Sequence, residues 1–254
     1  ASGRTSVTEP APTRDHTERM LTGFGYGVSR EKGVISVAGG GVLRGTEIDI
    51  PADISSAAFF MVGASIAPGS DLILEHVGLN PTRDGVITIL RAMGANIEVS
   101  QARTVGGEPV ADLRIRYAPL RGIDIPVEEV PLAIDELPAI LVAAACAEGV
   151  TVLRGAEELR VKESDRIASM AEGLTQLGIR NTVAPDGITV VGGTPSGGVI
   201  TTHHDHRIAM SFAMAALRAS DSIIVTDCAH VATSFPGFAD LAANTGLRLI
   251  VTAS

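Results

Sequence analysis

Three segments of the chain repeat one pattern of apolar and polar positions. Each begins with an Asp, runs through an Ala-rich apolar stretch of helical length, crosses a short β-type run and enters a second helical stretch that ends in Gly. The pairs of opening Asp and closing Gly are Asp53 and Gly94, Asp135 and Gly178, and Asp205 and Gly246. Their separations of 41, 43 and 41 residues predict three copies of one structural unit.

Each copy is predicted to be a β-α-β-α-β-β unit, which gives an α/β (α+β) fold class. The Asp stands where a helix N-cap is favoured, and the Gly stands where a left-handed residue closes a helix. Asp186-Gly187 is typical of a hairpin turn between two strands. The strands expected after the first helices are 71–77, 96–100, 112–117, 150–153, 181–184, 188–191, 223–226 and 247–251. The third unit therefore ends one strand short.

The beginning of the chain matches only the back half of such a unit. The tetrapeptide Pro-Thr-Arg-Asp occurs at 12–15 and at 81–84, and from its Thr to the following Gly both segments span 12 residues. We therefore expect residues 1–48 to be the back half of the last unit of a preceding domain, and 49–254 to be a three-unit domain that lacks one strand. The chain also begins at Ala1 without a Met. The sequence thus predicts the C-terminal part of a longer protein.

The composition is that of a globular protein and disfavours several classes of partner. Hydrophobic residues make up 45% of the chain and charged residues 19%. The net charge of −9 and the pI near 5.1 argue against nucleic acid or an anionic membrane as the main partner. No apolar run approaches the ~18 residues of a membrane span. Cys146 and Cys228 lack a CxxC spacing and are expected to be small buried hydrophobes in a reducing cytosol, which predicts a cytoplasmic location.

The densest polar cluster within a helical pattern lies at 160–166. On a helix, Lys162 and Arg166 are four residues apart and Glu163 and Arg166 are three apart, so their side chains are expected to lie close together near a helix start. One interpretation is a solvated helix face with ion pairs. The corresponding helix starts of the other units carry far less charge, which favours a functional site specific to this unit.

A second cluster, His203-His204-Asp205-His206-Arg207, opens an apolar helix. The three His residues lack the i,i+4 spacing that directs two imidazoles at one ion, and no Cys is near in sequence, so a zinc site is disfavoured. We predict instead that Asp205 caps the helix and that Arg207 projects from its first turn. A guanidinium beside the free N–H groups of a helix N-terminus suits a phosphate or a carboxylate.

Asp135 lies with Glu136 between apolar residues and is the third candidate. Its simplest interpretation is a helix N-cap, but a capping carboxylate that faces a cleft can also serve as a general base. Because the three units have the same polarity, their helix N-termini should gather at one end of the domain. The side chains expected there are Asp135, Glu163, Arg166 and Arg207. This set predicts proton transfer on an anionic substrate, with no metal and no cofactor.

Four motifs resemble the 5-enolpyruvylshikimate-3-phosphate (EPSP) synthase family, in order and at the family's spacing. They are PTRDHTER at 12–19, RVKESDR at 160–166, DHRIAM at 205–210 and ATSFP at 232–236. The resemblance covers essentially the whole chain and is strongest to the glyphosate-tolerant class of bacterial enzymes. It implies two domains, each of three βαβαββ units, that close on substrates between them. This agrees with the repeats.

The resemblance implies transfer of the enolpyruvyl group from phosphoenolpyruvate (PEP) to the 5-hydroxyl of shikimate 3-phosphate, with release of phosphate, as part of aromatic amino-acid biosynthesis. Asp135 would take the proton from the 5-hydroxyl, and Glu163 would protonate the methylene carbon of PEP. A carboxylic acid in that role needs a raised pKa, whereas a neighbouring guanidinium acts in the opposite direction. The implied substrate-binding residues are Arg166 and Arg207 for PEP, and Lys162 and Arg14 for shikimate 3-phosphate.

Two features qualify the resemblance. Thr233 stands where many family members have a lysine that reaches PEP, as it also does in the glyphosate-tolerant class. The family's Lys-Ser…Arg loop, its glycine-bearing PEP loop and its Ser-Ala-Gln phosphate site would all belong to a missing N-terminal portion. We therefore expect the 254-residue chain alone to be inactive and to need that portion as its partner.

Two alternatives stay open at this point. UDP-N-acetylglucosamine enolpyruvyl transferase shares the fold and the chemistry, although the motif at 205–210 favours the shikimate enzyme. The chain could also be a non-catalytic structural half-module, because half a cleft lacks some phosphate ligands and cannot exclude water by closing.

Overall fold

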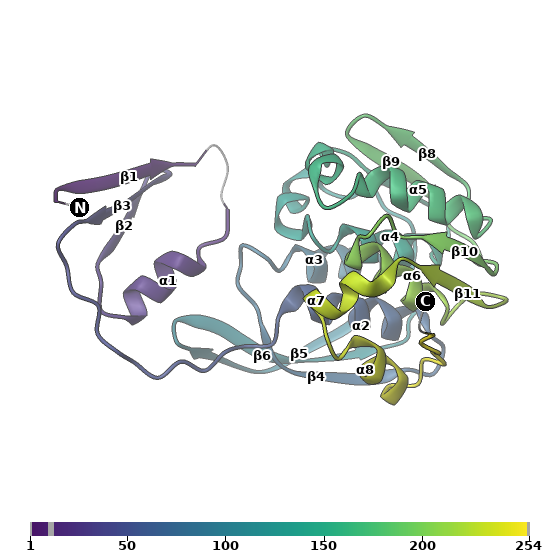
Figure 1. Ribbon diagram of the computed structural model, residues 1–254, viewed down its shortest axis with the longest axis horizontal. Helices are drawn as coiled ribbons and strands as arrows, with labels where there is room; N and C mark the ends of the chain where they lie inside the picture. The colour runs from purple at the N-terminus through teal and green to yellow at the C-terminus, as the bar shows by residue number, and fades with distance from the viewer. Residues whose placement is uncertain (1, 10–12, 253–254) are drawn as a thin grey trace.

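Three buried helices form the centre of the fold, one from each predicted unit. In the computed structural model, which describes residues 2–9 and 13–252, they are α2 (Ile54–Ile66), α4 (Leu137–Ala145) and α6 (His206–Ala215). These helices pack against one another within the main body of the molecule (Figure 1). Every residue of α4 is buried, and so is every residue of α2 except Ser56. A helix that is apolar on all sides belongs in a core, which explains the Ala-rich stretches of the sequence.

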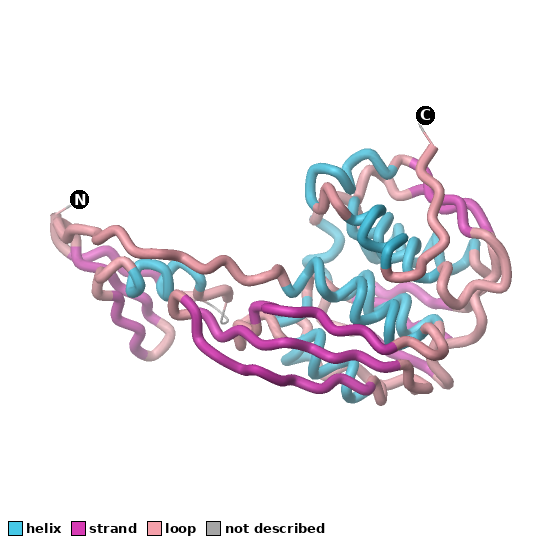
Figure 2. The backbone as a smooth tube through the Cα atoms, turned by 90° about the horizontal axis from the view of Figure 1, so that it is seen from below, coloured by secondary structure: helices cyan, strands magenta, loops and turns pink. Residues whose placement is uncertain are grey.

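Small sheets lie outside this helical centre (Figure 2). The first has the order β4 (Asp71–Gly78), β6 (Glu108–Arg116) and β5 (Asn96–Val105). The second has the order β7 (Val150–Leu153), β9 (Gly187–Val191) and β8 (Asn181–Ala184). Both are antiparallel, and in each the last strand of the unit lies in the middle. The third unit contributes the parallel pair β10 (Gly198–Thr201) and β11 (Ile223–Thr226).

The three units share their remaining features as well. Their second helices are α3 (Gly85–Ala92), α5 (Arg166–Gln176) and α8 (Phe238–Asn244). The leading strand is β10 in the third unit. In its place the first unit has one parallel bridge, Ala52 with Val77, and the second has two, Arg121 with Glu148 and Asp124 with Val152. The closing glycines Gly94, Gly178 and Gly246 have φ angles of 97°, 74° and 106°. Only glycine adopts this left-handed geometry without strain, so the repeated α/β fold predicted from the sequence is confirmed.

The predicted capping role is correct for two of the three repeat-opening Asp residues. The Asp53 carboxylate accepts a hydrogen bond from the backbone N–H of Ser56 at 3.1 Å, and Asp205 caps α6. The prediction is wrong for Asp135, because α4 begins at Leu137, one residue later than such a cap would require. Pro138 would then occupy the third helical position, where it has no N–H to offer a cap.

The N-terminal segment lies to one side of the main body (Figures 1 and 2). It consists of β1 (Arg4–Thr8), α1 (His16–Gly23), β2 (Val28–Glu31) and β3 (Val34–Ala38), with β3 in the middle of the sheet. Every residue of α1 is exposed or only partly buried. The side-chain amide of Asn80 donates to Asp15 at 2.7 Å and joins this segment to the main body. The division into 1–48 and 49–254 stays a prediction.

Short helices complete the chain, and two local predictions are wrong. The short helices are η1 (Val127–Glu129), η2 (Pro131–Ala133), η3 (Glu157–Val161), η4 (Cys228–His230) and α7 (Val231–Ser234). The expected strand at 247–251 is irregular, and Ile250 and Val251 are exposed, because no neighbouring strand in the described residues pairs with it. Cys228 is exposed rather than buried, since it follows the left-handed residue Asp227 in a surface turn.

Cys146 is partly buried against the core, and burial raises the pKa of its thiol to about 12, as expected for an unreactive cysteine. Ala1 and Pro12, which entered the sequence analysis, lie outside the described residues. Within the described residues, no helix is long and apolar enough to cross a membrane.

Substitution at the centre of α4 tests the role of this helix. Ile140 is fully buried, whereas Ile73 on β4 is 56% exposed. We expect Ile140→Ala to lower the free energy of unfolding by about 2–5 kcal/mol, because it leaves a cavity among packed helices. The matched change Ile73→Ala should have a much smaller effect. Urea unfolding of both variants measures the difference, and equal losses would contradict the proposed core.

Candidate active site

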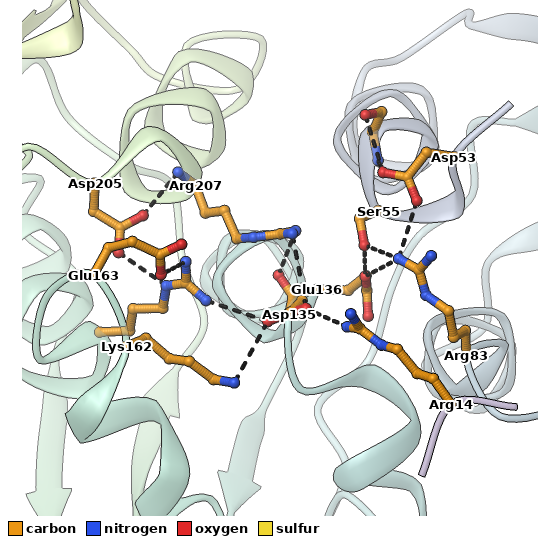
Figure 3. Close-up of polar contacts among 12 residues, drawn as sticks. Arg14, Asp53, Ser55, Arg83, Asp135, Glu136, Lys162, Glu163, Asp205 and Arg207 are labelled. Carbon is orange, nitrogen blue, oxygen red and sulfur yellow. Dashed lines mark hydrogen bonds and ion pairs between the residues drawn. The ribbon is translucent and has the colours of Figure 1, made fainter. Parts of the chain in front are cut away.

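Side chains from four segments of the chain meet at the carboxylate of Asp135, which lies just before α4 (Figure 3). One oxygen, Oδ1, lies 3.4 Å from a guanidinium nitrogen of Arg166 and 3.9 Å from Nζ of Lys162. The other oxygen, Oδ2, accepts a hydrogen bond from Arg14 and lies 3.8 Å from Arg207. Four cations therefore surround one carboxylate that is largely buried.

The guanidinium of Arg166 is the most buried of these cations, with 1% of its side chain exposed. Arg166 is the first residue of α5, and each of the three nitrogens of its guanidinium faces a different carboxylate. Nε donates to Asp205 at 2.9 Å, one terminal nitrogen donates to Glu163 at 2.5 Å, and the other donates to Asp135. A buried charge is tolerated only when it is paired and hydrogen-bonded, so these contacts are what allow Arg166 to lie here.

Asp205 links the buried guanidinium to α6. Oδ1 accepts from the backbone N–H groups of Arg207 at 2.9 Å and Ile208 at 3.4 Å, while Oδ2 accepts from Arg166 and from the hydroxyl of Ser164 at 3.0 Å. Burial raises the pKa of Asp205, but the hydrogen bond and charge of Arg166 outweigh it, so the pKa lies below its ordinary value. Asp205 is therefore ionised and holds two elements together.

The helix predicted within 160–166 begins later than expected, at Arg166. Lys162 and Glu163 precede α5, because Asp165 caps the helix by accepting from the backbone N–H of Ala168 at 3.0 Å. The predicted contact of Glu163 with Arg166 is present, but Lys162 does not lie beside Arg166. It donates to Glu158, four residues earlier, and its Nζ lies 3.9 Å from Asp135. Ser and Asp residues favour caps over helix interiors, and this preference overrode the charge spacing.

Arg207 projects from the first turn of α6, as predicted from the sequence. One terminal nitrogen donates to the backbone carbonyl of Asp135 at 3.1 Å. The neighbouring His206 has a pKa below its ordinary value, because burial disfavours its charged form and Arg207 repels it. Among the described residues, no group of three His, Cys, Asp or Glu side chains is arranged to hold a metal ion.

Known proteins share both this sequence and this fold. The model of the family described as EPSP synthase (3-phosphoshikimate 1-carboxyvinyltransferase) matches residues 1–241. The chain belongs to the EPSP synthase family. It is 66% identical to the 3-phosphoshikimate 1-carboxyvinyltransferase of Alkalilimnicola ehrlichii, over 98% of this chain and 56% of the relative. It is 64% identical to the protein of that name from Methylococcus capsulatus, over 99% of this chain and 58% of the relative.

Solved structures give the same relationship. An EPSP synthase from Acinetobacter baumannii superposes with a TM-score of 0.96 at 57% identity, over all of this chain and 59% of that protein. The enolpyruvyl transferase NikO from Streptomyces tendae shares the fold, with a TM-score of 0.72 at 18% identity, over 96% of this chain and 56% of NikO. The chain thus spans little more than half the length of the relatives it matches.

In this EPSP synthase family member, burial and charge act in opposite directions on Asp135. Burial raises the pKa of its carboxyl, but the charges of Arg207, Arg14 and Lys162 outweigh burial and hold the pKa below its ordinary value. Asp135 is therefore ionised, and it is a weak base for as long as these cations remain paired with it. An anionic ligand that took over some of the cations would make Asp135 more basic.

A second polar cluster beside Asp135 was not predicted. It contains Asp53 and Ser55 on the start of α2, Arg83 before α3, and Glu136 (Figure 3). Two signals were present in the sequence: Arg83 repeats the position of Arg14 in the Pro-Thr-Arg-Asp motif, and Glu136 lies in an otherwise apolar stretch. Neither signal indicates that the two residues come within 4.0 Å of each other.

The pairing of Asp205 with Arg166 makes stability depend on pH. Asp205→Asn should lower the free energy of unfolding by about 3–5 kcal/mol near neutral pH, because it leaves the buried guanidinium underpaired. The folded pKa of Asp205 is depressed, so its contribution is present above the unfolded pKa, near 4, and is lost as the pH falls through the folded pKa. The difference from the unsubstituted chain should therefore shrink below about pH 4.

Asp71→Asn is the control, because Asp71 makes exposed ion pairs with Arg114 and Arg116. Exposed pairs contribute little, so this variant should unfold almost like the original chain. Denaturant unfolding at several pH values measures both, and a pH-independent loss for Asp205→Asn would contradict the assignment.

Proposed function

We propose that this chain supplies one side of the active site of an EPSP synthase, which transfers the enolpyruvyl group from PEP to the 5-hydroxyl of shikimate 3-phosphate and releases phosphate. The observation that carries the proposal is the group of four cations around Asp135. Family membership supports the same reaction, since the relatives are named 3-phosphoshikimate 1-carboxyvinyltransferase. These names favour the shikimate enzyme over UDP-N-acetylglucosamine enolpyruvyl transferase, the alternative that the sequence had left open.

The cations are suited to the charges of the two substrates. PEP carries a carboxylate and a phosphate, which the planar guanidinium groups of Arg166 and Arg207 can bind through paired hydrogen bonds. We assign the phosphate of shikimate 3-phosphate to Lys162 and Arg14, which reach Asp135 from opposite sides in Figure 3. Each of these cations contacts a carboxylate of the chain. The substrate anions would therefore have to displace these carboxylates from the cations.

Two carboxylates supply the proton transfers in this proposal. The 5-hydroxyl oxygen attacks carbon 2 of PEP while Asp135 accepts the hydroxyl proton and Glu163 protonates carbon 3, which becomes a methyl group. The resulting tetrahedral intermediate then loses a methyl proton back to Glu163, and its bond to the phosphate oxygen breaks. The phosphate leaves with the proton that Asp135 had taken, so atoms and charge balance.

The substrates themselves would adjust the strength of Asp135 as a base. As the PEP and shikimate 3-phosphate anions engage Arg207, Arg14 and Lys162, the positive charge that depresses the pKa of Asp135 is shared with them. The carboxylate then becomes more basic when a hydroxyl is present to be deprotonated. Glu163, which is half exposed, has Arg166 as its cationic partner, and PEP binding to Arg166 would release it for proton donation.

Location in the cytoplasm and membership of the glyphosate-tolerant class both stay predictions. Two free cysteines are consistent with a reducing compartment. Thr233 lies in α7 and donates its hydroxyl to the carbonyl of His230 at 2.7 Å, within its own turn. Inhibition of the enzyme by glyphosate would test the subclass.

Complementation tests whether the chain acts alone. We expect no phosphate release from PEP and shikimate 3-phosphate with the 254-residue chain, and release once the part of the Alkalilimnicola ehrlichii enzyme that it does not cover is added. A colorimetric phosphate assay measures both, with an Arg207→Ala chain as the control that should stay inactive in the mixture. Robust activity of the isolated chain would contradict the proposal. A folded chain that stays inactive on mixing would favour the non-catalytic half-module.

The role of Glu163 is tested in the complete enzyme of which we propose this chain to be part. Glu163→Gln should lower kcat by about 100-fold or more with little change in KM, because the amide cannot donate the proton. The control is Glu172→Gln on α5, where a similarly exposed carboxylate pairs with His203 and should leave kcat unchanged. Steady-state kinetics measure both variants, and a loss confined to KM would reassign Glu163 to substrate binding.

A further inference from the structure

Glu136 is a buried carboxyl group that the proposed reaction does not use. Only 2% of its side chain is exposed, although it follows Asp135 directly in the chain. Its Oε1 accepts a hydrogen bond from the hydroxyl of Ser55, and a guanidinium nitrogen of Arg83 lies 4.0 Å away (Figure 3). One hydroxyl and one distant cation are few partners for a buried carboxylate.

The surroundings of Glu136 therefore disfavour its ionised form. Burial raises the pKa of Glu136 above its ordinary value, although the Ser55 hydroxyl and the charges of Arg207 and Arg83 act in the opposite direction. Above the unfolded pKa, a group of this kind lowers the stability of the fold as it ionises. A neutral side chain of the same shape would not carry this penalty.

The position of Glu136 connects it to two proposed substrate-contacting groups. Its backbone forms the turn into α4, with its N–H donating to Ala133 at 2.9 Å and its carbonyl accepting from Ile140 at 3.0 Å. Asp135 lies inside this turn, and its backbone carbonyl receives the hydrogen bond from Arg207. Any rotation of the turn would move the Asp135 carboxylate and also the Asp135 carbonyl that accepts the hydrogen bond from Arg207.

The side chain of Glu136 ties this turn to two other elements. Ser55 is in the first turn of α2, and its hydroxyl also accepts from Arg83 at 2.5 Å. The same nitrogen of Arg83 lies 3.0 Å from Asp53, the residue that caps α2. The network Asp53–Arg83–Ser55–Glu136 therefore runs from a helix cap and from the segment before α3 to the turn that carries Asp135.

We propose that Glu136 is a positioning residue of the transferase: through Ser55 and Arg83 it fixes the turn that directs the Asp135 carboxylate and the Arg207 guanidinium at the substrates. The inference rests on the proposed function. It assigns Glu136 no contact with substrate and no proton transfer. Because catalysis depends steeply on the placement of reacting groups, loosening this turn should lower turnover more than folding.

Substitutions in the complete enzyme test the network, with PEP and shikimate 3-phosphate as the probes. Glu136→Gln and Ser55→Ala should each lower kcat by about 10- to 100-fold, since a displacement of 1 Å can have such an effect. Ser55→Thr keeps the hydroxyl and should recover most of the lost kcat. The matched control is Ser65→Ala, at the other end of α2, where an equally buried hydroxyl donates to the Met61 carbonyl at 2.7 Å. This variant should keep its kcat.

Thermal unfolding midpoints, measured on the same samples, separate positioning from folding. We expect Glu136→Gln to keep or raise the midpoint at neutral pH while lowering kcat. The inference is overturned if kcat of both Glu136→Gln and Ser55→Ala stays within about twofold of the unsubstituted enzyme. It is equally overturned if kcat falls only in proportion to the loss of folded protein, or if Ser65→Ala lowers kcat as much. An unsubstituted enzyme that releases no phosphate from the two substrates would instead refute the proposed function.

Discussion

The buried guanidinium of Arg166 is the interaction on which the candidate site depends. It lies at the start of α5 with almost no exposure, and it can do so only because carboxylates from three separate segments face its nitrogens. One of them, Asp205, is also the cap of α6, so the orientation of that helix and the position of the cation are set together. The ion pairs of the site are therefore part of the core packing.

Repetition of one unit explains how segments that are distant in the sequence reach the same end of the domain. The first helices α2, α4 and α6 pack against one another with the same polarity, and their N-terminal ends carry Ser55, Glu136 and Arg207. Each end carries a partial positive charge, which favours anionic groups, and at α2 and α6 the carboxylates of Asp53 and Asp205 accept from the first N–H groups. The repeated units thus bring the starts of three helices together. The charged segment before α5 departs from the repeat and adds Lys162 and Glu163 to this group of side chains.

The sequence predicted the repeats, most strands and the gathering of Arg166 and Arg207 with Asp135, because periodicity, caps and left-handed glycines depend on local physics. Arg14 and Lys162 entered as substrate contacts only through the family resemblance. It misplaced Asp135 as a helix cap, since a single proline at 138 moved the helix start. It also missed the network of Ser55, Arg83 and Glu136, whose members are up to 81 residues apart in the chain. Contacts of this kind arise from tertiary packing, and no local pattern encodes them.

Charge balance within the site has a mechanistic consequence. Arg14, Lys162, Arg166 and Arg207 all contact carboxylates of the chain, so an anionic substrate gains affinity only by exchanging with these partners. In the reaction that we propose, this exchange lowers the net affinity, yet it leaves Asp135 and Glu163 less tightly paired with cations when they are to transfer protons. If the proposed reaction holds, part of the binding free energy of the substrates activates these carboxylates instead of stabilising the ground state, which favours a higher kcat. A turn held rigid by Glu136 would keep those released carboxylates in place during the exchange.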